Sequence, residues 1–283
     1  MDKQAIATWY DESSPLYRYF WYLNSDSFAL HYGFWDKKTK HIGDALQNTN
    51  KVMAEQVNIT PNDRVLDAGC GIGGSVLWLA KNKKAEVVGI SISAKQIEKA
   101  KTLAKQAKVD HLVSFSVIDY LHTGFPNDSF DVVWAIESVC HAEKKEDFLE
   151  EAYRVLKKGG RIIIADGFIK REPKTEREKQ LVTDFYKGML LPNLYTFDQF
   201  EDAMKKTGFK HVAVFDKTHE VLPSVKRFYL ICRFMYPFIV IAAVLHIVPY
   251  IFIAGCKAGI VQYEAVQGGV GGYGIMYGEK QAE

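Results

Sequence analysis

The chain has 283 residues, 48% of them hydrophobic and 25% charged, a size and composition that suit one compact α/β core with an added cap. Its net charge is only +2 and its basic residues are scattered among acidic ones, so nucleic acid is not expected as a partner. The four cysteines are far apart and have no metal-type spacing to histidine. We therefore predict no metal site, and a reducing, cytoplasmic compartment.

Helices and strands are predicted to alternate along most of the chain. A helical N-terminal arm is expected over about residues 1–24, followed by a helix near 41–57. Further helices are expected at 75–81 and 94–107. The predicted strands lie near residues 63–67, 86–90, 112–117, 131–136, 161–166, 211–216 and 272–277. This alternation predicts a Rossmann-like, doubly wound, mostly parallel sheet of seven strands, with the ligand beyond the carboxyl ends of the strands.

A glycine turn follows the first predicted strand. Asp67 ends that strand, and Gly69, Gly71 and Gly73 come directly after it. Glycines allow a sharp turn and a close approach of a ligand, because a Cβ at these positions would collide with it. The pattern indicates a nucleotide-like ligand. A dinucleotide-binding fold would place an acid at position 91 to hold the ribose, but Ser91 stands there.

The Asp-x-Gly-x-Gly-x-Gly pattern resembles that of class I S-adenosylmethionine-dependent methyltransferases, and nearly all of residues 29–278 is similar to that family. The further segments that carry the resemblance are Gly89–Ser93, Val117–Tyr120, Phe125–Asp131 and Glu151–Gly160. The resemblance implies S-adenosylmethionine as the cofactor. It also implies a cofactor site in which Asp67 and the glycines face the methionine and ribose, Asp119 beside Tyr120 holds the adenine, and the ribose is shared among Ser91, Ser93 and Gln96.

The segment after the fourth predicted strand resembles the Ala-Ile-Glu-x-x-Cys-His-Ala segment of sterol C-methyltransferases. Glu137 and His141 are four residues apart in it. On one helical turn they would face the same pocket, as a carboxylate and an imidazole able to pass a proton. The alternative for His141 is a capping or core histidine bonded to a backbone carbonyl.

Residues 28–36 resemble the aromatic His-Tyr-Gly-x-Trp segment that closes over the cofactor in sterol, tocopherol and related small-molecule methyltransferases. Tyr32 is the third predicted catalytic residue, because aromatic faces stabilise a sulfonium or a carbocation. Phe28 and Phe34 are equally consistent with ordinary packing. The other aromatic residues of the arm are expected mainly to pack: Trp9, Tyr10, Tyr17, Tyr19, Trp21 and Tyr22.

The sequence from Phe228 to Gly255 is almost continuously apolar, and residues 235–255 are long enough to span a hydrocarbon core of about 30 Å. The run is interrupted by Pro237, His246 and Pro249. A membrane crossing would also prevent the final strand from pairing with the strand at 211–216. We therefore expect an apolar helical lid inserted between the last two strands, which covers an oily substrate or rests on a bilayer.

Three segments are predicted: a helical arm with an aromatic cap (1–57), a cofactor-binding core (58–218), and the lid with the final strand (219–283). The predicted function is methylation of a hydrophobic small molecule, preferably C-methylation of a sterol or isoprenoid alkene. The alternatives are O- or N-methylation of a lipid-like phenol, quinone or amine, and a non-catalytic S-adenosylmethionine-binding protein. Peripheral membrane contact is consistent with the lid. The oligomeric state is not predicted.

Overall fold

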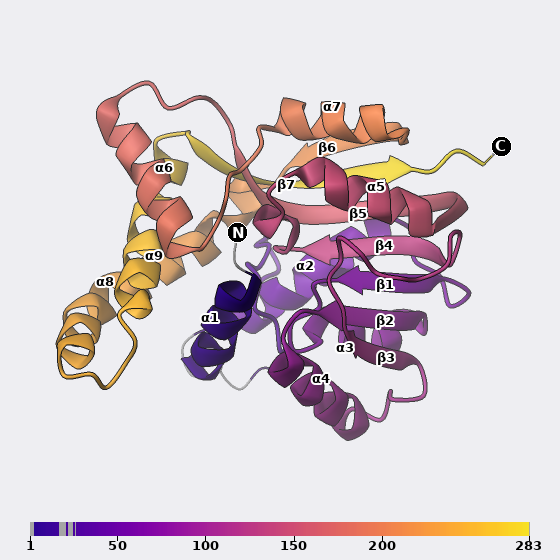
Figure 1. Ribbon diagram of the computed structural model, residues 1–283, viewed down its shortest axis with the longest axis horizontal. Helices are drawn as coiled ribbons and strands as arrows, with labels where there is room; N and C mark the ends of the chain where they lie inside the picture. The colour runs from indigo at the N-terminus through magenta and orange to yellow at the C-terminus, as the bar shows by residue number, and fades with distance from the viewer. Residues whose placement is uncertain (1–2, 17–20, 22–24, 26, 283) are drawn as a thin grey trace.

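The computed structural model describes residues 3–16, 21, 25 and 27–282. A seven-stranded sheet in the order β3-β2-β1-β4-β5-β7-β6 forms its centre (Figure 1). The strands are β1 (Arg64–Ala68), β2 (Glu86–Ser91), β3 (Val113–Val117), β4 (Phe130–Ile136), β5 (Leu156–Ile169), β6 (Lys210–Asp216) and β7 (Gly271–Glu279). Neighbours from β3 to β5 are parallel, whereas β7 is antiparallel to both β5 and β6. The predicted mostly parallel sheet is thus confirmed.

Helices cover both faces of the sheet, because the apolar side chains of the inner strands alternate between two cores. Val132 and Trp134 of β4 belong to the core under α2, α3 and α4, while Val133 and Ala135 belong to the core under α5 and α7. The helices are α1 (Lys3–Leu16), α2 (Ile42–Gln56), α3 (Gly74–Lys83), α4 (Ala94–Gln106), α5 (Lys145–Val155), α6 (Glu176–Gly188), α7 (Phe197–Thr207), α8 (Thr218–Val244) and α9 (Ile251–Gln267).

The predicted N-terminal helix is present as α1, which ends at Leu16. Apart from Trp21, the remainder of the arm as predicted, including Tyr17, Tyr19 and Tyr22, lies outside the described residues. The division of the chain into three segments at residues 57 and 218 stays a prediction.

The predicted lid is also present, since α8 and α9 form a helical hairpin inserted between β6 and β7. The two flanking strands pair with each other, with Val214 opposite Met276. Figure 1 shows α8 and α9 beside α6, with the turn between α8 and α9 pointing away from the sheet. Helix α8 is long and apolar enough to cross a membrane by length and composition, and 11% of its apolar window is buried.

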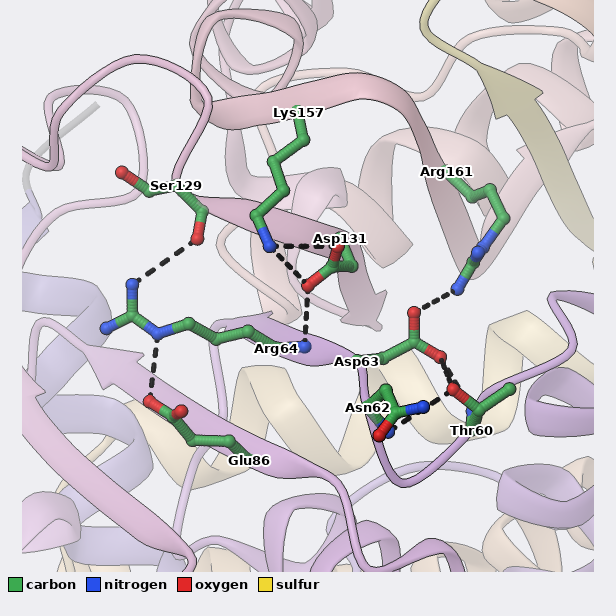
Figure 2. Close-up of polar contacts among 9 residues, drawn as sticks. All are labelled: Thr60, Asn62, Asp63, Arg64, Glu86, Ser129, Asp131, Lys157 and Arg161. Atoms are coloured by element: carbon green, nitrogen blue, oxygen red, sulfur yellow. Dashed lines mark hydrogen bonds and ion pairs between the residues drawn. The ribbon is translucent and has the colours of Figure 1, made fainter. Parts of the chain in front are cut away.

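Ion pairs and hydrogen bonds tie the strands together at the amino edge of the sheet (Figure 2). The backbone N–H of Arg64 donates to Asp131 Oδ2 at 2.9 Å, and Lys157 Nζ donates to the same oxygen at 2.8 Å. Arg161 Nη2 donates to Asp63 Oδ1 at 2.6 Å. The predicted site residues lie at the opposite edge, so this network positions β1, β4 and β5 without contacting the site.

Candidate active site

A cavity opens at the carboxyl ends of the strands, next to β1 and β4. The strand order reverses between these two strands, which is the usual position of a ligand in such a sheet. Eleven of the twelve predicted site residues line the cavity: Tyr32, Asp67, Gly69, Gly71, Ser91, Ser93, Gln96, Asp119, Tyr120, Glu137 and His141. The exception is Gly73. It caps α3 with φ of 88°, and a Cβ there would lie 3.1 Å from Ala100 Cβ, so backbone conformation and packing account for this glycine.

Asp67 lies at the end of β1 with a carboxyl oxygen that lacks a partner. The residue is 2% exposed, and its Oδ2 accepts no hydrogen bond from any described residue. Burial raises the pKa of Asp67 to about 8, because a charged carboxylate is poorly stabilised without solvent or a partner. A ligand with hydrogen-bond donors or positive charge fits beside it, which the amino acid part of S-adenosylmethionine provides.

The glycine turn after Asp67 leaves room for such a ligand. Gly69 has φ of 97°, and a Cβ there would lie 2.4 Å from Ser138 Cβ. Gly71 has φ of 54° and faces the cavity near the side-chain amide of Gln96. Larger residues would be strained at both positions, so the turn exposes backbone to the cavity.

The polar groups after β2 form a small network that reaches α1. Ser91 Oγ donates to Gln96 Oε1 at 2.8 Å, and the Gln96 N–H donates to Ser93 Oγ at 3.0 Å. Ser93 Oγ in turn donates to the Asp11 carboxylate. An acid therefore does reach this end of the cavity, although it comes from the N-terminal helix instead of position 91.

Helix α1 also contacts the residue predicted to hold the adenine. Lys3 Nζ donates to Asp119 Oδ2, while Asp119 Oδ1 accepts from the N–H of Leu121 at 3.0 Å. The neighbouring Tyr120 donates its hydroxyl to the Ser138 carbonyl at 3.0 Å. The helix thus covers the carboxyl ends of β2 and β3, as Figure 1 also shows.

Glu137 follows β4 and is held by two distant segments. Its Oε1 accepts from the backbone N–H of Tyr32 at 2.7 Å and from the Tyr273 hydroxyl at 2.9 Å. Its Oε2 accepts no hydrogen bond from the described residues, which leaves this oxygen for a ligand. Burial raises the pKa of Glu137 to about 8, although its two hydrogen bonds favour the charged form.

The expectation that Glu137 shares a helical turn with His141 is wrong. Glu137 has φ of 48°, and its N–H donates to the Ala165 carbonyl of β5 at 2.8 Å. This bond to the sheet prevents a helix from starting there, and a short 3₁₀ turn, η2 (Val139–His141), begins two residues later. The two side chains line the same cavity but are held by different partners.

His141 is a neutral imidazole whose proton position follows from its partners. Its Nδ1 lies 3.2 Å from the Leu190 carbonyl oxygen, which can only accept, so Nδ1 carries the proton. Its Nε2 lies 3.0 Å from the Tyr10 hydroxyl and accepts from it. Burial lowers the pKa of His141 to about 4. His141 is therefore bonded to a backbone carbonyl through Nδ1, as the alternative prediction stated, and its ring also lines the cavity.

Aromatic rings from three separate segments form the wall beside Glu137. The Tyr32 ring centroid lies 5.5 Å from that of Trp21, 6.4 Å from that of Phe228 and 6.3 Å from that of Tyr273. The Tyr32 hydroxyl donates to Gln262 Oε1 at 2.5 Å. All four rings line the cavity, and a positive charge placed against the face of such a ring would be stabilised.

Sequence reasoning did not assign four residues of this site: Lys3, Tyr10, Asp11 and Tyr273. Tyr10 was expected only to pack, and Tyr273 was noted only as part of the last strand. A local signal was present for Tyr10 and Asp11, which stand together in an aromatic-acidic block at the start of the chain. Among the described residues, no group of three or more His, Cys, Asp or Glu is placed to hold a metal ion.

The sheet order, the glycine turn and the unpartnered acid are features of an α/β protein that binds a nucleotide-like cofactor. The model of the methyltransferase domain family matches residues 66–164. The 27-O-demethylrifamycin SV methyltransferase of Amycolatopsis mediterranei (strain S699) is 31% identical over 220 residues, which cover 77% of this chain and 78% of that protein. The chain therefore belongs to the S-adenosylmethionine-dependent methyltransferases, and S-adenosylmethionine is its cofactor.

The chain is also similar to other methyltransferases and to solved structures. The 24-methylenesterol C-methyltransferase 2 of Arabidopsis thaliana is 29% identical over 73% of this chain and 56% of that protein. A solved [4+2]-cyclase, SpnF, superposes with a TM-score of 0.81 at 23% identity, covering 99% of this chain and 97% of that one. A geranyl diphosphate methyltransferase superposes with a TM-score of 0.77 at 20% identity, covering 98% and 99%. These two structures establish the fold, which hosts more than one reaction.

Proposed function

We propose that this methyltransferase transfers a methyl group to a carbon of a hydrophobic alkene, such as a sterol side chain or another isoprenoid. The buried carboxylate of Glu137, with one oxygen fixed by Tyr32 and Tyr273 and the other available, carries this proposal. The apolar side chains that line the cavity on the lid side support a hydrophobic acceptor: Phe185, Met189, Leu191, Leu194 and Phe228. The sterol C-methyltransferase among its relatives and the geranyl diphosphate methyltransferase among its structural neighbours support the same class of acceptor.

In the proposed reaction, the cofactor supplies an electrophilic methyl group on a sulfonium. The π electrons of the alkene would form a new carbon–carbon bond to this methyl group while the methyl–sulfur bond breaks. The electron pair of the broken bond would stay on sulfur as a neutral thioether, so the positive charge moves to the acceptor. The rings of Tyr32, Trp21 and Tyr273 surround that charge and exclude water. Glu137 Oε2 then removes a proton from a neighbouring carbon, and the released electron pair forms the product double bond. Asp67, Gln96 and Asp119 are proposed to hold the cofactor so that its methyl group faces the acceptor carbon.

A second candidate, O-methylation of a hydroxyl, is favoured by His141. Its neutral imidazole lines the cavity, and the Tyr10 hydroxyl now bonded to Nε2 occupies the place of an acceptor hydroxyl. The relative named as a 27-O-demethylrifamycin SV methyltransferase fits this chemistry. In that reaction Nε2 would take the hydroxyl proton while the oxygen attacks the methyl group.

The test combines methyl-labelled cofactor with a sterol, an isoprenoid alkene and a lipid-like phenol, and identifies the labelled atom by mass spectrometry and NMR. We expect a new carbon–methyl bond. Glu137→Gln should lower turnover by roughly 10²- to 10⁴-fold and leave cofactor affinity unchanged, whereas His141→Ala should have a smaller effect. A labelled oxygen, with the larger loss in His141→Ala, would instead establish the second candidate.

A further inference from the structure

Exposed apolar side chains of this protein are concentrated on the distal part of the lid hairpin. Nine large hydrophobic side chains are exposed among the described residues, and eight of them lie between residues 230 and 250. They are Leu230, Phe234, Phe238, Ile241, Val244, Leu245, Ile247 and Tyr250. Phe234 is 69% exposed and Ile247 is 71% exposed, so these side chains are not part of a folded core.

The exposed residues of α8 form a stripe along one side of the helix. Their spacing of three or four residues, from Leu230 to Leu245, places them on the same face. The opposite side is packed: Val225 and Cys232 are buried, and the Cys256 thiol of α9 donates to the Cys232 carbonyl at 3.1 Å. The apolar stripe is therefore on the outer face of the hairpin, because the inner face of α8 is already packed against α9.

The charged residues of this region are all basic. No Asp or Glu occurs between residues 221 and 263, although the chain has 34 acidic residues elsewhere. The same stretch holds Lys226, Arg227, Arg233 and Lys257. Lys226 and Arg233 are exposed and form no ion pair with a described residue, whereas Lys257 pairs with Asp184 at 2.9 Å. Such a face is complementary to a surface with an apolar interior and negatively charged outer groups.

We propose that the α8–α9 hairpin docks on an anionic lipid bilayer, with the stripe and the 245–250 turn in the headgroup and upper acyl region. Lys226 and Arg233 would contact lipid phosphates, since juxtamembrane cations add to apolar burial in such binding. Tyr236 and Tyr250 have the amphipathic rings that are typical of this depth.

Contacts at the base of the hairpin favour docking on one side of the bilayer over a membrane-spanning α8. Ser224 is fully buried near the start of α8, where its Oγ accepts from Gly33 N–H at 3.1 Å and from Trp35 Nε1 at 2.9 Å. The helix follows β6 directly, and α9 leads back to β7 in the same sheet. The chain thus enters and leaves the bilayer on one side, and only the distal half of the hairpin is free to insert.

Docking would also bring the acceptor side of the cavity close to the lipid. Phe228 lies two residues before the stripe on α8 and lines the cavity, as does Gln262 of α9. This part of the inference rests on the proposed function, because it assumes an acceptor that resides in the bilayer. The docking itself does not, and it is measurable without cofactor or acceptor.

Vesicle flotation of the purified full chain tests the docking. We expect binding to phosphatidylcholine vesicles that contain phosphatidylglycerol, and weaker binding to phosphatidylcholine alone or at high salt. A Phe234→Ser, Phe238→Ser double variant should bind at least about tenfold less. Arg233→Gln should reduce binding to the anionic vesicles only. Val117→Ser is the matched control, because Val117 is 54% exposed but lies outside the hairpin.

Three results would overturn the proposal. Absence of vesicle binding in a folded monomer would refute docking. A dimer in sedimentation experiments that the double variant disrupts, without vesicle binding, would identify the stripe as an interface between copies. Resistance to alkaline carbonate extraction would identify an integral span. Methylation of a short, soluble acceptor without vesicles, measured alongside, separates failure of docking from failure of the proposed reaction.

Discussion

Two buried carboxyl groups with raised pKa values dominate the site at the scale of single residues. Asp67 and Glu137 both have pKa values of about 8, and burial is the main cause for each. Their neutral forms are favoured in the folded protein without ligand, so they contribute stability below about pH 4 that is lost as the pH rises toward 8. A cationic ligand beside Asp67 reverses this preference for that group, since it stabilises the ionised form.

We therefore expect cofactor binding to release protons at neutral pH. Calorimetry at pH 7 in buffers of different ionisation enthalpy should show release approaching one proton, with affinity increasing from pH 6 to 8. Asp67→Asn should remove most of this release and weaken binding. Glu137→Gln, a matched change on the acceptor side, should retain it. Unchanged release in Asp67→Asn would show that the cofactor does not charge this carboxyl.

At the scale of elements, α1 acts as a cover over the cofactor side of the cavity. Its residues Lys3, Tyr10 and Asp11 contact Asp119, His141 and Ser93, which follow three different strands. Ile6 and Ala7 on the same side of the helix are each 6% exposed and line the cavity. We therefore expect exchange of the cofactor to require movement of α1, because these contacts lie over the residues predicted to bind it.

A Lys3→Ala, Asp11→Ala double variant should consequently exchange cofactor faster. We expect the dissociation rate to rise by roughly threefold to tenfold, because the exposed Lys3–Asp119 ion pair and the Ser93–Asp11 hydrogen bond are each worth about 1 kcal/mol. Stopped-flow fluorescence would measure the rate. Glu12→Gln is the matched control, since Glu12 is exposed on the same helix. Equal dissociation rates in both variants would mean that α1 does not cover the bound cofactor.

At the scale of the whole molecule, the site lies at the carboxyl ends of strands that are held together by ion pairs at their amino ends. Asp63 is 7% exposed and accepts from Arg161 Nη2 at 2.6 Å, from the Thr60 N–H at 2.6 Å and from Thr60 Oγ1 at 2.9 Å (Figure 2). The pair joins the turn before β1 to β5 and is far from the cavity.

Loss of this pair should lower stability without changing cofactor affinity. Asp63→Ala should decrease the free energy of unfolding by about 1–3 kcal/mol, because Arg161 and the Thr60 N–H lose a charged acceptor. Chemical denaturation gives that value, and calorimetry should give an unchanged dissociation constant. Lys101→Ala, which removes an exposed pair with Glu98, should change stability by less than about 0.5 kcal/mol. A similar loss in both variants would contradict a special role for Asp63.

The sequence by itself determined the strand positions, the glycine turn, the cofactor class and the inserted lid. These features depend on patterns within short windows: alternating burial, glycine where φ is positive, and a long apolar run between two strands. Asp67 and Gly69 could be assigned because the turn that exposes them is local. The resemblance to methyltransferases added the identity of the cofactor and the predicted role of each residue that would hold it.

The tertiary structure alone decided how the acceptor side is built. The partners of Glu137 are 105 and 136 residues away, and Tyr10 is 131 residues from His141. No local pattern encodes such contacts, because they depend on the arm, the lid and the last strand meeting at one edge of the sheet. A further bond, from the Glu137 backbone N–H to the Ala165 carbonyl, holds Glu137 to β5 and prevents the helical turn that its spacing to His141 predicts. Local propensity was overridden there by hydrogen bonds between distant segments.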